Sequence, residues 1–212
     1  MADIADIVVV GGGVHGASTA WHLAKRNAGK IVLIEKDAIA SGASGWSSAI
    51  VRMHYQLESL VKVTMYGREM YGDWENIVGV GESGFRKVGF LVLFPEDEIE
   101  HGHSVIKMQQ GLGIDARYIS RDEISQIEPR LSIEDVAAGA WEPNSGYADG
   151  STVANSFVAA ARSLGVEVRI GPEAVGLTSA DDKITGVDTS EGMIHAGTVI
   201  VEAGFRTSAL LA

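Results

Sequence analysis

The stretch VVVGGGVHG, residues 8–16, constrains the fold of this chain more than any other. It follows β-forming residues and opens a segment whose small and apolar residues recur at helical spacing. Glycine loses more backbone freedom on folding than any other residue, so three in a row imply a gain elsewhere. Backbone without side chains can approach a phosphate closely, and the N–H groups and dipole of a helix start attract it. We therefore expect this turn to hold a nucleotide pyrophosphate.

The flanking segments complete a strand–turn–helix–strand unit. The apolar residues of 4–10 predict a strand buried on both faces, as in parallel sheets covered by helices. Residues 14 to about 27 predict a helix, residues 27–30 a turn, and Ile31 to Ile34 a second buried strand.

The pattern G-x-G-x-x-G falls on Gly11, Gly13 and Gly16. In this motif the first glycine permits the tight turn, the second lets the backbone approach the pyrophosphate, and the third lets helix and strand pack closely. Glu35 follows Gly16 by 19 residues, near the usual spacing of about 20 to the acid that binds a ribose hydroxyl. A carboxylate there would repel a 2′-phosphate, which argues against an NADP-type ligand. His15 lies inside the motif at a position that tolerates many side chains, so we interpret it as a bystander within the binding turn.

Composition excludes several classes of function. The net charge of −11 disfavours nucleic acid or an anionic membrane surface as a partner. The absence of cysteine removes disulfides, thiolate nucleophiles and zinc–thiolate sites. The acidic N-terminus does not have the pattern of a signal peptide, and no apolar run is long enough to span a bilayer. We expect a soluble cytoplasmic protein.

A loop rich in small and hydroxyl residues follows the second strand, with the sequence SGASGWSS at residues 41–48. Such a loop can lie flat against a planar ligand and donate hydrogen bonds to it, or it can be a flexible surface loop. Composition leaves both alternatives open.

Several segments, taken in order, resemble the D-amino-acid oxidase superfamily of flavoproteins, especially the sarcosine oxidase and dimethylglycine dehydrogenase type. They are the glycine turn, the EKD and SGAS sequences, IVRMHY (50–55), GYADGSTVANSFVAAARSLGVEV (146–168) and KITGVDTSEGMIHAGTVIVEAG (183–204). The resemblance implies an α/β fold: an FAD-binding, Rossmann-like parallel sheet of the glutathione-reductase type, with a partial β-rich substrate domain. It also implies a discontinuous FAD-binding domain of residues 1–80 and 150–212 and a partial substrate domain of residues 81–149.

The resemblance further implies FAD as the cofactor. The residues that would lie along it are Gly11, Gly13, Val14, His15, Gly16, Glu35, Lys36, Ser41, Gly42, Ser44, Trp46, Ser47, Ser48, Val175, Ala203 and Gly204. Some relatives carry a Trp–His pair whose histidine bonds covalently to the flavin, but here Trp46 is followed by Ser47. With cysteine also absent, we expect non-covalent FAD.

On the same resemblance, the enzyme oxidises the C–N bond of a small amino acid or N-methyl amino acid. Arg52 matches the arginine that binds the substrate carboxylate, and Tyr55 and His54 are further candidates near the substrate. The alternative for Arg52 is a structural salt bridge or a surface charge.

The remaining segments predict further elements and no metal site. We expect helices over about 58–78, 97–111 and 149–164, a strand or hairpin over 85–94, and a capping box at Ser120 that opens a short helix. Residues 166–170 and 198–201 predict strands of the parallel sheet. His101 and His103 are two residues apart, on different helix faces, so we expect both to be solvated.

Members of this superfamily continue well beyond the length of this chain, so we expect part of a longer enzyme, a natural short form or one piece of a split enzyme. Two other functions stay open at this point: a non-catalytic FAD-binding subunit and an NAD-dependent dehydrogenase. The expected partners are an amino-acid substrate and either a second copy of the chain or a subunit that supplies the rest of the enzyme.

Overall fold

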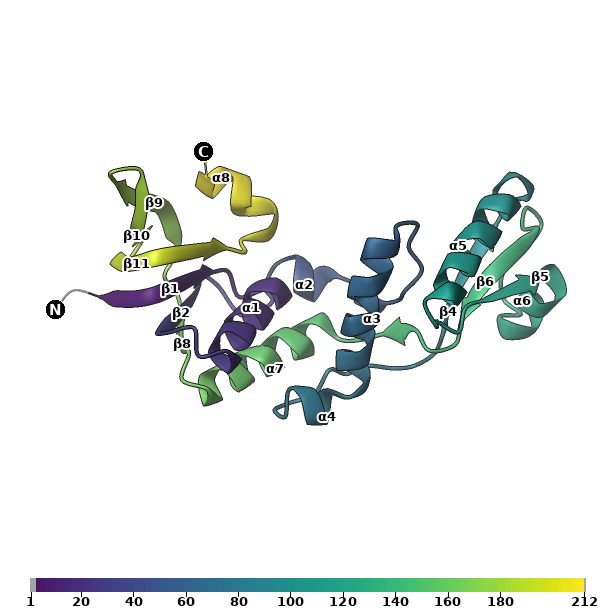
Figure 1. Ribbon diagram of the computed structural model, residues 1–212, viewed down its shortest axis with the longest axis horizontal. Helices are drawn as coiled ribbons and strands as arrows, with labels where there is room; N and C mark the ends of the chain where they lie inside the picture. The colour runs from purple at the N-terminus through teal and green to yellow at the C-terminus, as the bar shows by residue number, and fades with distance from the viewer. Residues whose placement is uncertain (1–2, 212) are drawn as a thin grey trace. The chain divides into compact units, whose positions relative to one another are not determined.

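The structure of the protein is a computed structural model that describes residues 3–211 (Figure 1). The chain divides into two compact units. The first unit contains the residues up to Ala49, Trp74–Gly84 and the residues from Asp149 onward, and the second contains Ile50–Asp73 and Phe85–Ala148. The assignment of an FAD-binding domain and a substrate domain to the chain stays a prediction.

The first unit is built on a six-stranded sheet. Its strand order is β8 (Glu167–Ile170), β2 (Ile31–Glu35), β1 (Ile4–Val10), β11 (Gly192–Val201), β10 (Lys183–Thr189) and β9 (Ala174–Ala180). The first four strands are parallel, and β10 and β9 continue the sheet antiparallel. This mostly parallel sheet confirms the predicted fold class, including the return of residues 198–201 to the centre of the sheet.

Two helices of the first unit, α1 (Val14–Lys25) and α7 (Gly150–Ser163), pack against each other (Figure 1). The ring centres of Trp21 on α1 and Phe157 on α7 lie 5.5 Å apart. Helix α7 begins where the side chain of Asp149 accepts a hydrogen bond of 2.6 Å from the N–H of Thr152, a side-chain cap that satisfies one of the free donors of the first turn. The other short helices of this unit are α2 (Ala43–Trp46), α4 (Trp74–Ile77), η2 (Gly204–Arg206) and α8 (Thr207–Leu211).

The central strands β1 and β2 are buried on both faces over Val8–Val10 and Ile31–Ile34. One face carries a cluster formed by Val8, Val10, Val32 and Ile34 with residues of β10 and β11. Val9 and Leu33 alternate to the opposite face and are also fully buried. Each such side chain contributes about 1.5–3 kcal/mol when it is removed from water. The continuous apolar runs of the sequence therefore reflect a sheet covered on both sides.

The second unit contains a three-stranded antiparallel sheet of order β4 (Phe90–Phe94), β6 (Ala138–Glu142) and β5 (Arg117–Ser120). A separate short pair joins β3 (Ile50–Val51) to β7 (Gly146–Tyr147). The helices of this unit are α3 (Glu58–Gly72), η1 (Glu96–Glu98), α5 (Ile99–Gly111) and α6 (Arg121–Ile127). Its core gathers Val61, Phe94, Ile106 and Ala140 with their neighbours.

Two predicted elements are shorter than expected. The helix over 58–78 breaks at Asp73, whose φ of −127° ends α3 before α4 begins. The strand or hairpin over 85–94 was wrong in its first half, because only Phe90–Phe94 forms a strand. Gly89 has a φ of +83°, far from the extended backbone of a regular strand. The capping box at Ser120 is confirmed, with Glu123 as its second member.

Among residues 3–211, no helix is both long enough and apolar enough to cross a membrane.

Candidate functional site

The glycine turn between β1 and α1 packs directly on neighbouring main chain. Gly11 has a φ of +112°, and a Cβ there would lie 2.8 Å from the carbonyl carbon of Glu202, just after β11. A Cβ on Gly16 would overlap the carbonyl oxygen of Gly11. The first and third glycines of the motif therefore have the geometric roles predicted for them: a left-handed turn and a close helix–strand approach.

Gly13 is the N-cap residue of helix α1 and has no side chain to cap it. The first turn of the helix contains no acidic residue. The N–H of Val14 donates to Ser44 Oγ at 2.9 Å, so the hydroxyl-rich loop touches the helix start. A helix N-terminus concentrates free N–H groups and partial positive charge. This end of α1 is suited to an anion.

Glu35 ends β2 beside the glycine turn. Its carboxylate accepts the N–H of Gly12 at 2.7 Å through one oxygen and the N–H of Asp37 at 2.9 Å through the other. A carboxylate offers about four lone-pair sites, so these two bonds leave acceptors for ribose hydroxyls. The structure thus brings Glu35 and the turn together, as the sequence spacing predicted.

Three further predicted residues lie near this turn or beside the end of β2. Lys36 Nζ pairs with Glu173 Oε1 at 2.6 Å, and this hydrogen bond lowers the pKa of Glu173. The pair brings the start of β9, with Val175 59% exposed, next to the end of β2. Ala203 follows Glu202, whose N–H donates to the carbonyl of Val10 at 2.8 Å.

The other predicted residues of the first unit are exposed or half-buried. His15 is 85% exposed in its side chain, with Nδ1 3.9 Å from Glu202 Oε2. Ser47 Oγ accepts the N–H of Ala49 at 2.9 Å, and Trp46 is 76% exposed. The rest of this group is Ser41, Gly42, Ser48 and Gly204. The role of this group in binding stays a prediction.

In the second unit, Arg52 is held by aromatic rings. Its guanidinium carbon lies 5.0 Å from the ring centre of Tyr55 and 5.0 Å from that of Phe90. Guanidinium groups stack favourably on aromatic faces and keep their edge N–H donors free for a carboxylate. No salt bridge of Arg52 was found among residues 3–211.

His54 lies next to a buried polar cluster that the sequence did not reveal. Its side chain is 12% exposed, and burial lowers its pKa, while the carboxylate of Glu142 acts in the opposite direction. Glu142, Gln109 and Ser145 are fully buried. The only hint in the sequence is a glutamate that ends the apolar strand segment AGAWE.

Glu142 has three hydrogen-bond donors. Its Oε2 accepts the N–H of Met53 at 3.0 Å and the hydroxyl of Ser145 at 2.8 Å. Its Oε1 accepts the side-chain amide of Gln109, whose NH₂ also donates to the carbonyl of Met53 at 3.1 Å. Both main-chain groups of Met53 are thus bound by buried side chains. This cluster therefore fixes the backbone between Arg52 and His54.

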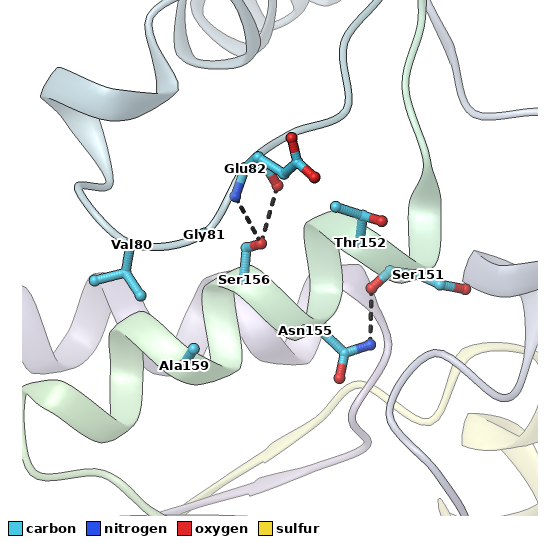
Figure 2. A pocket seen from close by; sticks show the side chains of 8 residues that line it. All are labelled: Val80, Gly81, Glu82, Ser151, Thr152, Asn155, Ser156 and Ala159. Carbon is cyan, nitrogen blue, oxygen red and sulfur yellow. Dashed lines mark hydrogen bonds between the residues drawn. The ribbon is translucent and has the colours of Figure 1, made fainter.

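An open pocket in the first unit is a separate feature (Figure 2). In Figure 2 the Oγ of Ser156 on α7 joins both main-chain groups of Glu82, accepting its N–H at 3.0 Å and donating to its carbonyl at 2.9 Å. The lining residues are Val80, Gly81, Glu82, Ser151, Thr152, Asn155, Ser156 and Ala159. None of them is a predicted site residue, so this pocket is not the candidate site.

No metal centre is found among the side chains of residues 3–211, where no group of three or more His, Cys, Asp or Glu residues could hold an ion. His101 and His103 are exposed as predicted, and the ring of His103 stacks on Tyr118 at 4.0 Å.

Comparison with known proteins gives a consistent result. The family model described as "DAO: FAD dependent oxidoreductase" matches residues 6–212. Sarcosine oxidase subunit beta of an Arthrobacter species is 27% identical over 97% of this chain and 52% of its own length. The crystal structure of L-proline dehydrogenase from P. horikoshii superposes with a TM-score of 0.89 at 27% identity, over 99% of this chain and 55% of its own. Glycine oxidase from Bacillus cereus superposes with a TM-score of 0.81 at 27% identity, over 98% of this chain and 57% of its own. The chain thus spans little more than half the length of each of these relatives.

Proposed function

This chain belongs to the family of FAD-dependent oxidoreductases, and we propose that it is part of an enzyme that oxidises the C–N bond of a small amino acid or N-methyl amino acid. The three relatives described above act, by their names, on sarcosine, L-proline and glycine. Each of these substrates carries an amine and a carboxylate on the same carbon atom. FAD is the cofactor of this family, so the alternative of an NAD-dependent dehydrogenase is set aside.

The residues present fit FAD. The strongest observation is the glycine turn, where a Cβ on Gly11, Gly12 or Gly16 would collide with neighbouring atoms. In the first turn of α1 the N–H of Val14 donates to the neutral hydroxyl of Ser44, and no acidic side chain of that turn competes with an anion. We infer that Gly11, Gly13 and Gly16 hold the pyrophosphate and that Glu35 accepts hydrogen bonds from the ribose.

The attachment is inferred to be non-covalent. Trp46 is followed by Ser47 rather than by a histidine, and the sequence contains no cysteine. Acid precipitation should therefore release all of the flavin into the supernatant.

Arg52 is inferred to bind the substrate carboxylate. Its guanidinium carbon lies 5.0 Å from the centre of each of two aromatic rings, and these contacts restrict its motion before the substrate arrives. A bidentate guanidinium–carboxylate pair fixes both position and orientation. FAD, when bound, accepts the hydrogen and the electron pair that leave the substrate carbon. The contribution of the chain is to bind and orient the amino acid.

Purified protein tests this proposal directly. We expect the visible absorbance of a bound flavin and its anaerobic bleaching by sarcosine, L-proline or glycine. Colour without bleaching by any small amino acid would remove the catalytic assignment. It would favour the second candidate, an FAD-binding subunit that requires another chain.

One observation favours that second candidate. Helix α3 and the residue before it expose several apolar side chains in the second unit: Leu57, Leu60, Val63 and Tyr66. Large exposed apolar patches are uncommon on isolated proteins and often mark contact surfaces. The Arthrobacter relative is itself named as a subunit. Adding a candidate partner should then restore bleaching.

A further inference from the structure

Two buried polar atoms of the second unit lack hydrogen-bond partners among the described residues. They are His54 Nδ1 and Gln109 Oε1. A buried polar group without a partner is costly, so each such atom requires an explanation. Both atoms belong to the cluster that holds the backbone of Met53.

The orientation of Gln109 follows from its other contacts. Its nitrogen donates to two oxygens, the Met53 carbonyl and Glu142 Oε1, so its own oxygen is the atom left over. Glu142 Oε1 lies 4.0 Å from His54 Nδ1. The interactions of His54 with Glu142 and with Gln109 both raise its pKa, which is the effect of acceptors facing a ring N–H.

We propose that Glu142 and Gln109 are positioning residues that hold His54 in the tautomer with hydrogen on Nδ1, leaving Nε2 as its basic nitrogen. A separation of 4.0 Å is longer than a hydrogen bond, and such contacts often tighten when a substrate binds. The tautomer of a histidine is set by the partner of its other nitrogen. A ring nitrogen that faces only oxygen acceptors is stable only as N–H.

The consequence for catalysis rests on the proposed function. Amino acids carry an ammonium group at neutral pH, and the amine must lose this proton before its C–N bond is oxidised. In the Nδ1–H tautomer the free lone pair of His54 lies on Nε2, so Nε2 is the ring atom at which this histidine can take up a proton.

Other charges act on the same ring. Arg52 and His101 oppose protonation of His54, and the burial of the ring opposes it more strongly. The carboxylate of Glu142 acts in the opposite direction and raises the pKa of His54. Its loss should therefore move both the tautomer and the pKa of His54.

The test is nitrogen NMR of the 212-residue protein labelled with ¹⁵N-histidine. The signals of His54 are assigned by their loss in His54→Asn. We expect the Nδ1–H form in at least about tenfold excess in the unsubstituted protein. In the opposite tautomer the lone pair of Nδ1 would face the lone pairs of the Glu142 and Gln109 oxygens, which is unfavourable. In Glu142→Gln we expect that excess to fall severalfold and the pKa to drop. The exposed Glu134→Gln, also in the second unit, is the matched control and should change neither value.

An Nε2–H form in the unsubstituted protein would overturn the proposal. So would an unchanged tautomer ratio in Glu142→Gln. If that variant does not fold, Gln109→Met removes the second acceptor at similar volume, and an unchanged ratio there overturns the proposal equally. The NMR measurement needs no substrate. If amino acids fail to bleach the flavin, the proposed function is wrong, but the tautomer of His54 is still tested independently. In active protein, the pH midpoint of the bleaching rate should follow the pKa of His54.

Discussion

Replacement of Gly16 by alanine tests the glycine turn most directly. A Cβ at this position would overlap the carbonyl oxygen of Gly11 and lie 3.1 Å from its carbonyl carbon. The obstruction is main chain rather than a flexible side chain, so relief requires α1 and β1 to move apart. The effect should appear both in the stability of the first unit and in its affinity for FAD.

The magnitude follows from two opposing effects. Alanine is favoured over glycine inside a helix by about 1 kcal/mol. Overpacking of a well-filled site costs about 1–3 kcal/mol, and a backbone obstruction belongs at the upper end. We therefore expect Gly16→Ala to lower the free energy of unfolding by about 1–2 kcal/mol. A displaced turn should also weaken FAD binding by about tenfold or more, equivalent to about 1.4 kcal/mol.

The chain offers a matched control at Gly67, in the middle of α3. A Cβ there has no neighbour within 4 Å, so only the helix preference remains. Gly67→Ala should raise stability by about 0.5–1 kcal/mol and leave FAD affinity unchanged. Urea unfolding followed by circular dichroism, with FAD titration by fluorescence quenching, measures both quantities. If Gly16→Ala binds FAD as tightly as the unsubstituted protein and is equally stable, the reasoning about this turn is refuted.

Three further predictions address other parts of the molecule. Glu35→Gln should weaken FAD binding by about tenfold, because charge-assisted hydrogen bonds contribute about 1.5–3 kcal/mol; calorimetry measures it, and an unchanged Kd would contradict the role in ribose binding. Arg52→Lys should raise the half-saturating amino-acid concentration in anaerobic bleaching by about tenfold or more, with flavin content unchanged; equal saturation curves would favour a structural role for this arginine. The hydrogen bond from Arg169 lowers the pKa of Asp3 below its usual 3.8, so the stability from this pair is present above that pH and is lost as the pH falls through the lowered value. Arg169→Met should remove this part of the acid dependence in unfolding experiments from pH 2 to pH 6 at constant salt, and an unchanged pH profile would show that the pair contributes nothing.

The parts of the fold that follow local rules could be predicted from the sequence. Continuous apolar runs predicted β1 and β2, because a strand covered on both faces needs no alternation. Ser120 with Glu123 predicted the start of α6, because a capping box satisfies its donors within four residues. The relation between Glu35 and the glycine turn was predictable, because a short strand–helix–strand unit fixes that distance.

The parts that depend on distant partners could not be predicted. Glu142 and Gln109 are joined across 33 positions, and nothing in either segment shows that both side chains are fully buried. Lys36 and Glu173 are similarly remote in sequence. Gly89 could have indicated a break in its strand, but only the ring of Trp141 beside it explains why glycine is needed there.

The central sheet has a consequence for synthesis and folding. Strand β1 pairs with β2, which follows it closely in sequence, whereas its other neighbour, β11, contains His195, the partner of Ile4. Pairing between segments so far apart in sequence slows folding, because a long loop must close before the contact forms. The edge of β1 that pairs with β11 therefore stays unpaired in the nascent chain until residues 192–201 have been synthesised, and ribosome-arrested chains that end before residue 192 should be selectively sensitive to protease.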